Sequence, residues 1–305
     1  MRRMKTRQAT KQTLMLLALI ALLAFITTCA PSNPPVLTST PNSPTSTPQQ
    51  TLTPSPAPDL VTAKPTQPAC LSQPGRVDEG ILQSTTPPQE FLIYLPPCYD
   101  EGTDRYPVLY LLHGQTYTSD QWIRLGAVEA LDQLILSGKA RAFIIVFPQD
   151  RYWYTESGSG FGDQVVHGLI PYIDKSYRTI PDRSQRAIGG LSRGAGWALR
   201  LGLSNWDLFG IIGLHSLAIL QEDGSRIERW LKDIPPPSHP VIFMDIGDND
   251  PEFARAQEVE SSFNDYGLSH EWHLYNGAHT EEYWQAHVQE YIEWYANQLK
   301  NLTAQ

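Results

Sequence analysis

The chain has 305 residues, of which 41% are hydrophobic and 18% charged, and its net charge is −9. This length accommodates one large domain or two small ones. An acidic chain with few basic clusters is poorly suited to nucleic acid or anionic lipid headgroups, so the composition argues against both partners.

The first 28 residues have the pattern of an export signal. Residues 1–11 carry five basic side chains and no acid, and an apolar run of 13 residues follows over 14–26. A membrane-spanning helix needs about 20 residues, so the run suits the h-region of a signal peptide better, with a stop-transfer anchor as the alternative. Removal of residues 1–28 takes the net charge from −9 to −14, because the five basic residues are the only charges there.

Cys29 follows the apolar run almost directly. The sequence Ile26-Thr27-Thr28-Cys29 resembles the lipobox of bacterial lipoproteins, although threonine replaces the usual small residue before the cysteine. Residues 31–69 then contain 11 Pro and 13 Ser or Thr, a composition that buries too little surface to fold. We predict a signal peptide over 1–28, a disordered linker over 29–69, and lipidation of Cys29 that anchors an exported protein to the membrane.

The other two cysteines, Cys70 and Cys98, form one pair. An export signal implies an oxidising compartment, in which such a pair is expected to be a disulfide. The bond would tie the end of the linker to the second strand. Two buried free thiols are the alternative.

Residues 70–305 have the composition of one globular domain. The patterns predict strands over 75–84, 90–95, 108–112, 142–147, 186–190, 210–215, 241–246 and 270–275. They predict helices over 127–137, 161–175, 192–203, 253–266 and 280–301, and a polar, proline-ended excursion before residue 240. The first two strands are expected to pair antiparallel at a sheet edge. Alternating strands and helices indicate an α/β fold, with a mostly parallel central sheet and helices on both faces.

Ser192 stands where a predicted strand passes into a helix. The segment Gly190-Leu191-Ser192-Arg193-Gly194 has the GxSxG pattern of a nucleophile elbow, a turn so sharp that the serine backbone is strained. Its hydroxyl would be exposed at the amino end of a helix. Five residues taken alone also fit a glycine-rich helix start with a capping serine.

A serine nucleophile needs a base, and the base needs an acid. In an open parallel sheet, ligands bind beyond the carboxyl ends of the strands, where His279 follows the last strand and Asp250 the strand before it. Serine, acid and histidine then occur in the order of an α/β-hydrolase. Asp248 is the alternative acid. The loop lacks the downstream glycine and glutamate of a calcium site, so we predict no metal.

The remaining candidates surround this triad. We expect the backbone N–H groups of Gln115 and Arg193 to stabilise an oxyanion. The Arg193 side chain is left with two interpretations, contact with a substrate carboxylate or pairing with an acid of the domain. His113 is expected to shape the loop opposite the nucleophile. His215, with Ser216, is expected to line the pocket, and His215 is the alternative base.

Three motifs carry a resemblance to a known family: Tyr106-Pro-Val-Leu-Tyr-Leu-Leu-His-Gly, Gly190-Leu-Ser-Arg-Gly-Ala and Gly277-Ala-His-Thr-Glu-Glu-Tyr-Trp. With them the chain resembles the putative esterase family of α/β-hydrolases over nearly all of residues 76–299. The family includes feruloyl and acetylxylan esterases, enterochelin esterases, S-formylglutathione hydrolases and mycolyltransferases. The resemblance implies hydrolysis of a carboxylic ester without metal or cofactor, and it favours Asp250 over Asp248.

We therefore predict a monomeric serine esterase that acts on a small-molecule or glycan ester through an acyl-enzyme. Two alternatives stay open. One is an acyltransferase with a sugar or lipid acceptor. The other is a surface protein on the same scaffold that binds glycan through the aromatic residues 152–154.

Overall fold

The computed structural model describes residues 68–151 and 160–301. The predicted export signal, the Cys29 anchor, nearly all of the linker and the aromatic residues 152–154 lie outside the described residues. Within the two described ranges, none of the helices has the length and apolar character needed to cross a bilayer.

An eight-stranded sheet runs through the described residues in the order β1-β2-β4-β3-β5-β6-β7-β8. β2 pairs antiparallel with both β1 and β4, and all other neighbours are parallel. The predicted mostly parallel sheet with an antiparallel edge is confirmed. The strands are β1 (Arg76–Leu82), β2 (Gln89–Leu95), β3 (Val108–Leu112), β4 (Ile144–Pro148), β5 (Arg186–Leu191), β6 (Ile211–His215), β7 (Val241–Gly247) and β8 (His270–Tyr275).

The central strand β3 is buried along its whole length. Tyr110 and Leu112 face one core cluster, whereas Leu109 and Leu111 face another on the opposite side of the sheet. Because successive side chains of a strand point to opposite faces, both faces must be covered. This explains why the strand is continuously apolar.

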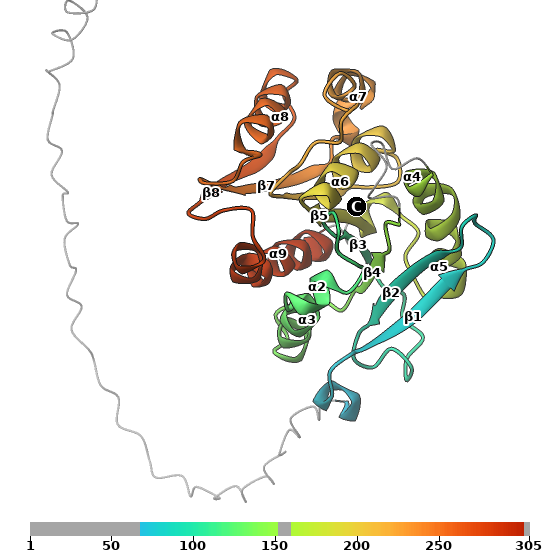
Figure 1. Ribbon diagram of the computed structural model, residues 1–305. Helices are drawn as coiled ribbons and strands as arrows, with labels where there is room; N and C mark the ends of the chain where they lie inside the picture. Colours follow the sequence, from blue (N-terminus) through green and yellow to red (C-terminus); the bar gives the residue numbers. More distant parts are fainter. Residues whose placement is uncertain (1–67, 152–159, 302–305) are drawn as a thin grey trace, which may run out of the picture. The chain divides into compact units, whose positions relative to one another are not determined.

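Helices cover both faces of the sheet (Figure 1). The longest, α9, packs with α3 on one face, and α5, α6 and α8 contribute to the core on the other. The loops that follow β5, β7 and β8 meet at the carboxyl ends of these strands. The helices are α2 (Gln121–Arg124), α3 (Ala127–Leu136), α4 (Phe161–Asp163), α5 (Ile170–Ser176), α6 (Arg193–Ser204), α7 (Ile227–Asp233), α8 (Phe253–Asp265) and α9 (Glu281–Asn301).

The helix predicted over 161–175 is divided into three segments. Between α4 and α5 lies a π-helical stretch, η2 (Gln164–Leu169). Pro171 stands near the start of α5 and has no N–H, so it cannot continue an α-helical ladder from the preceding turn. The wider π turn accommodates this gap in the hydrogen bonding.

The excursion predicted before residue 240 contains a helix, α7, that the sequence did not indicate. This helix has seven residues, of which Ile227, Trp230 and Leu231 are buried. An isolated helix of this length is unstable in water. Its stability comes from burying these three side chains, which recur at the i, i+3, i+4 spacing of one helix face.

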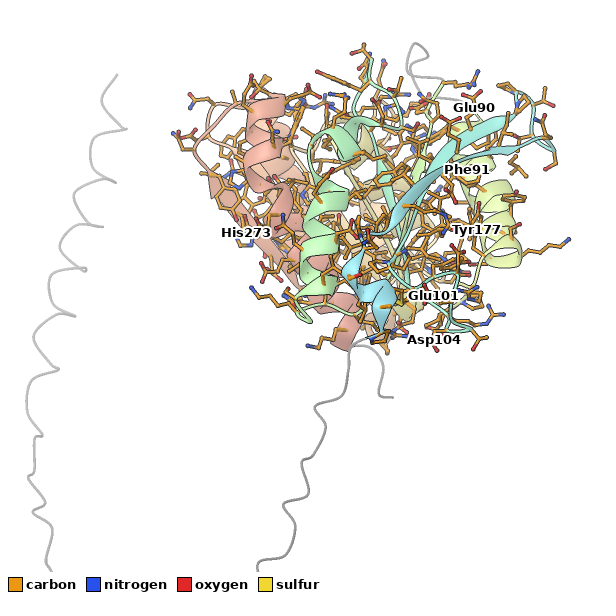
Figure 2. All side chains as sticks on the ribbon, turned by 90° about the horizontal axis from the view of Figure 1, so that it is seen from below. Glu90, Phe91, Glu101, Asp104, Tyr177 and His273 are labelled. Atoms are coloured by element: carbon orange, nitrogen blue, oxygen red, sulfur yellow. A yellow bond between two sulfur atoms is a disulfide. The ribbon has the colours of Figure 1, made fainter. Side chains whose placement is uncertain are left out.

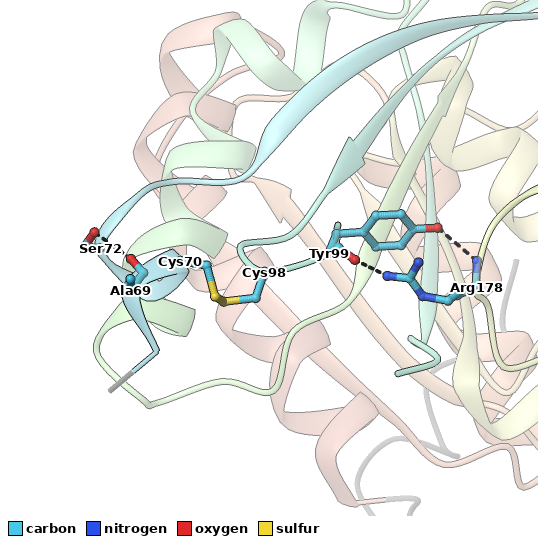
Figure 3. Close-up of a disulfide and its surroundings, with 6 residues drawn as sticks. All are labelled: Ala69, Cys70, Ser72, Cys98, Tyr99 and Arg178. Carbon is cyan, nitrogen blue, oxygen red and sulfur yellow. Dashed lines mark hydrogen bonds between the residues drawn. A yellow bond between two sulfur atoms is a disulfide. The ribbon is translucent and has the colours of Figure 1, made fainter. Parts of the chain in front are cut away.

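Cys70 and Cys98 form the predicted disulfide (Figure 3). It joins the one-turn helix Ala69–Ser72 to the segment that follows β2. Beside it, the Arg178 guanidinium lies over the Tyr99 ring, 4.0 Å from the ring centre, and the Arg178 backbone N–H donates to the Tyr99 hydroxyl at 3.0 Å. The start of the domain is thus fastened both covalently and by packing.

Candidate active site

Ser192 occupies a tight turn between β5 and α6. Its backbone angles are φ 55° and ψ −123°, a region that a residue with a side chain rarely adopts. A Cβ on Gly190 would lie 2.3 Å from the Gly194 carbonyl carbon, and one on Gly194 would lie 2.1 Å from the Leu112 oxygen. Both positions therefore require glycine, which explains the spacing of the motif around the serine.

Three of the predicted side chains meet beyond the ends of β5, β7 and β8. The His279 imidazole lies between the other two, with Nε2 2.8 Å from Ser192 Oγ and Nδ1 2.8 Å from Asp250 Oδ2. The Asp250 side chain is fully buried, whereas that of His279 is 23% exposed. An imidazole in this position is able to accept the serine proton while the carboxylate stabilises its charged form.

Asp248 lies apart from this arrangement. Its carboxylate accepts the Gly277 N–H at 3.0 Å and the Asn276 side-chain amide at 3.2 Å, which ties the loop after β7 to the loop that carries His279. The hydrogen bond from Gly277 lowers the pKa of Asp248. Within the described ranges, no cluster of His, Cys, Asp or Glu is arranged to hold a metal ion.

The His279 ring is supported from α9. Trp284 meets it edge to face, with ring centres 5.0 Å apart. The Trp284 indole N–H donates to Ser216 Oγ at 3.0 Å, which fixes the indole in place. The helical spacing of the sequence indicated only that Trp284 belongs to the core, since a contact with His279 depends on how α9 docks.

The loop after β3 faces the nucleophile. A Cβ on Gly114 would lie 3.7 Å from Ser192 Cβ, and the Gly114 N–H donates to Gln121 Oε1 at 2.8 Å. Gln115 follows directly, and Arg193 is the first residue of α6. Of the two residues predicted to supply oxyanion donors, Arg193 directly follows Ser192 in the chain. Gln115 directly follows Gly114, which faces Ser192.

His113 connects this loop to the segment that follows β4. Its Nε2 accepts the Asp150 N–H at 2.9 Å, and its Nδ1 lies 2.8 Å from the Gly114 oxygen. Burial lowers the pKa of the His113 imidazole, so the neutral ring, with one donor and one acceptor, matches both contacts. His113 thus occupies the place expected for a residue that shapes the loop.

The expectation that His215 lines the pocket is wrong. Its ring is fully buried against α9, where it stacks on Tyr291 with ring centres 3.8 Å apart. Nδ1 lies 2.7 Å from Asp245 Oδ1, and Nε2 lies 3.0 Å from the Tyr295 hydroxyl. The side chain at the end of β6 points to the α9 face of the sheet, so only the His215 backbone, whose oxygen accepts the Ser192 N–H at 2.9 Å, reaches the elbow.

The Arg193 side chain pairs with an acid of the domain, one of its two predicted interpretations. Its Nε donates to Asp150 Oδ2 at 3.0 Å, and the Trp197 indole N–H donates to the same oxygen at 3.0 Å. The side chains of Arg193 and Asp150 are 9% and 5% exposed. The sequence did not identify Asp150, which follows β4 and is 43 residues from Arg193.

His273 lies in β8 and packs among aromatic rings. Figure 2 labels His273 on the flank formed by β8 and α9, opposite Phe91 of β2. His273 stacks between Phe243 and Tyr275, with ring centres 4.6 and 5.7 Å away. This aromatic packing agrees with the structural role that its place in a strand predicted.

The comparisons with known proteins agree with the geometry. The family model described as "Putative esterase" matches residues 83–294. An endo-1,4-beta-xylanase/feruloyl esterase of Xylanibacter ruminicola is 32% identical over 180 residues, which are 55% of this chain and 24% of that protein. Esterase Rv1288 of Mycobacterium tuberculosis is 31% identical over 147 residues, 45% of this chain and 31% of that protein. The chain thus matches about a quarter to a third of the length of these relatives.

A solved structure of a ferulic acid esterase superimposes with a TM-score of 0.66 and 26% identity, covering 74% of this chain and 100% of that one. The predicted α/β-hydrolase fold and the family resemblance are both confirmed. The family match spans most of the described domain, including the residues around Ser192, Asp250 and His279. This chain therefore belongs to the Putative esterase family of α/β-hydrolase enzymes.

Proposed function

We propose that this protein is a serine esterase that hydrolyses carboxylic esters through an acyl-enzyme. The observation that carries the proposal is the line of contacts from Ser192 Oγ through His279 to Asp250, with both hydrogen bonds at 2.8 Å. The strained elbow at Ser192 and the family match support the same chemistry.

The proposed reaction has two halves. Ser192 Oγ attacks the ester carbonyl as His279 Nε2 takes its proton, and the backbone N–H groups of Gln115 and Arg193 stabilise the oxyanion. The carbon–oxygen bond to the alcohol then breaks, and the alcohol leaves with the proton from His279. Water attacks the acyl-enzyme with His279 again as base, which releases the acid and restores the serine. Asp250 stabilises the imidazolium in both halves.

We further propose that the substrates are hydroxycinnamoyl esters of plant polysaccharides. The names of the relatives, feruloyl esterase and ferulic acid esterase, support this class. Hydrolysis of methyl ferulate and of feruloylated xylo-oligosaccharide should therefore exceed that of acetylated xylan in kcat/KM. Preference for the acetyl ester would refute the substrate class and leave the esterase chemistry intact.

The proposed location is outside the cytoplasm, on a lipid anchor at Cys29. The Cys70–Cys98 disulfide supports an oxidising compartment. Full-length protein should fractionate with the membrane, and Cys29→Ala should release it. Equal membrane association of both would contradict the anchor.

Ser192→Ala tests the nucleophile. We expect kcat for p-nitrophenyl acetate and methyl ferulate to fall by about 10⁴-fold or more, because triad members act as a unit. A fluorophosphonate probe should label the wild type and not the variant. Ser204→Ala, on the exposed side of the same helix, is the matched control and should keep full activity. Unchanged turnover in Ser192→Ala would overturn the proposal.

A further inference from the structure

Asp150 is a buried carboxylate just past the end of β4 that takes no part in the triad. One of its oxygens accepts hydrogen bonds from both Arg193 Nε and Trp197 Nε1, each at 3.0 Å. A buried ion pair gains little net stability, since the desolvation of both charges offsets their attraction. Stability alone therefore does not explain why this ion pair is present. The other contacts of Asp150 indicate a second role.

The backbone of Asp150 leads to the loop after β3. Its N–H donates to His113 Nε2 at 2.9 Å, and the other ring nitrogen of His113 donates to the Gly114 carbonyl at 2.8 Å. The Asp150 carboxylate fixes the position of this backbone through Arg193 and Trp197. A continuous chain of hydrogen bonds thus runs from α6 through Asp150 to the Gly114 carbonyl.

The Gly114 carbonyl and the Gln115 N–H belong to the same peptide group. A trans peptide is planar, so its C=O and N–H point in opposite directions. A hydrogen bond that fixes the direction of the Gly114 carbonyl therefore also fixes the direction of the Gln115 N–H. The preceding peptide is held too, because the Gly114 N–H donates to Gln121 Oε1 at 2.8 Å.

The other proposed oxyanion donor is attached to the same carboxylate. Arg193 carries this donor on its backbone and the ion pair to Asp150 on its side chain. Asp150 is thus connected to both donors, to one through the arginine side chain and to the other through His113. We propose that Asp150 is a positioning residue that holds the Gln115 and Arg193 amides in the relative orientation an oxyanion requires. This inference rests on the proposed esterase function.

Asp150→Asn tests the inference, because it removes the charge and keeps the volume. Loss of one well-placed oxyanion donor lowers kcat by about 10²–10³-fold, and a misaligned donor should cost about 10–100-fold. We expect this loss in kcat, with KM for p-nitrophenyl acetate changed less than about twofold. The Ki of an alkyl trifluoromethyl ketone, whose adduct with serine carries an oxyanion, should rise by the same factor as kcat/KM falls.

Asp174→Asn is the matched control. Asp174 forms a partly buried ion pair with Arg186 at 2.7 Å, at the end of β5 opposite to Ser192, where the arginine is buried and the Asp174 side chain is 19% exposed. Each variant removes the carboxylate charge that pairs with a buried arginine, so both should be less stable. Asp174→Asn should nevertheless keep the wild-type kcat and ketone Ki. Equal losses of kcat in the two variants would show a general structural effect and overturn the inference.

Two further variants keep the test decisive if Asp150→Asn does not fold. Trp197→Phe removes one of the two donors to Asp150 and should lower kcat severalfold with KM unchanged. Arg193→Met combined with Asp150→Asn leaves no unpaired buried charge and should fold, and it should still lower kcat because neither backbone is held by the ion pair. Wild-type kcat in a folded Trp197→Phe or Asp150→Asn would contradict the positioning role. A wild-type protein that neither hydrolyses esters nor reacts with fluorophosphonate would instead refute the proposed function.

Discussion

Two histidine–aspartate pairs lie near the same end of the sheet and differ in what surrounds them. His279 Nδ1 is 2.8 Å from Asp250, and His215 Nδ1 is 2.7 Å from Asp245. The first pair has a histidine that is 23% exposed, whereas both side chains of the second are fully buried. The distance between acid and histidine is thus nearly the same in the two pairs.

The third partner of each pair explains the difference. His279 Nε2 faces Ser192 Oγ at 2.8 Å, whereas His215 Nε2 faces the Tyr295 hydroxyl at 3.0 Å. Burial raises the pKa of Tyr295, so its hydroxyl keeps the proton that it can donate to His215 Nε2. An aspartate–histidine pair therefore becomes a candidate for catalysis through its access to a nucleophile, and without that access it is part of the core.

The Asp245 carboxylate also connects α9 to the sheet. The hydroxyls of Tyr283 and Tyr291 donate to its Oδ2 at 2.7 and 2.6 Å. Burial raises the pKa of both tyrosines, which keeps these donors protonated. Tyr283 lies in the first turn of α9, directly after the loop that carries His279. The His215–Asp245 pair thus helps to position the start of α9, and with it the loop that carries His279.

The same substitution in both histidines should give opposite results. His279→Ala should lower kcat by about 10⁴-fold or more and change stability little, because its ring is partly exposed. His215→Ala should lower the free energy of unfolding by about 3–5 kcal/mol, because it leaves a cavity and removes a donor from a buried carboxylate. Urea unfolding measures the change in stability, and ester hydrolysis at equal protein concentration measures the change in kcat.

Equal losses of kcat in His215→Ala and His279→Ala would contradict this comparison. If His215→Ala, corrected for the fraction that is folded, lost as much kcat as His279→Ala, the buried pair would have a role in the chemistry itself. Unfolding midpoints at several temperatures establish the folded fraction independently of activity.

The two acids of the loop after β7 give the next largest effect. Asp250→Asn should lower kcat by about 10⁴-fold, because an amide in place of the carboxylate selects the wrong imidazole tautomer. Asp248→Asn removes the charge and one of two acceptor oxygens, but its amide oxygen can still accept the Gly277 N–H, so it should lower kcat only severalfold. Equal losses in the two variants would mean that the position of the loop, and not the charge of Asp250, limits turnover.

The buried His113 gives the smallest effect. Burial lowers the pKa of His113 in the folded state, below the value of about 6.5 expected in the unfolded chain. Its contribution to stability is therefore present above pH 6.5 and is lost as the pH falls toward the folded-state pKa. Urea midpoints should decline between pH 7 and pH 5, and His113→Gln should flatten this decline. An equal decline in both proteins would assign the acid sensitivity to other groups.

Several features of the fold and of the site could be predicted from local sequence patterns. The run 108–112 is apolar at every position, which predicts a strand covered on both faces, and every one of its side chains is buried. Glycines at 190 and 194 predict the elbow because a Cβ at either position collides with backbone. Asp250 and His279 were found from chain order and from the rule that ligands bind beyond strand ends, both of which depend on topology alone.

Contacts between distant side chains did not follow from local pattern. Asp150 meets Arg193 across 43 residues, and His215 meets Tyr295 across 80. α7 has only seven residues, so its packing against the core through Ile227, Trp230 and Leu231 is what stabilises it. Such pairs depend on which face of a strand or helix is buried against which neighbour.

By itself, the sequence determined the order of the strands and of the longer helices, the elbow at Ser192 and the triad candidates, because periodicity and steric limits act over a few residues. The tertiary structure decided that His279 reaches Ser192 while His215 turns into the core, and that the Arg193 side chain pairs with Asp150. The physical reason is that side-chain direction at a strand end is set by the packing of whole helices against the sheet, which is a property of the assembled fold.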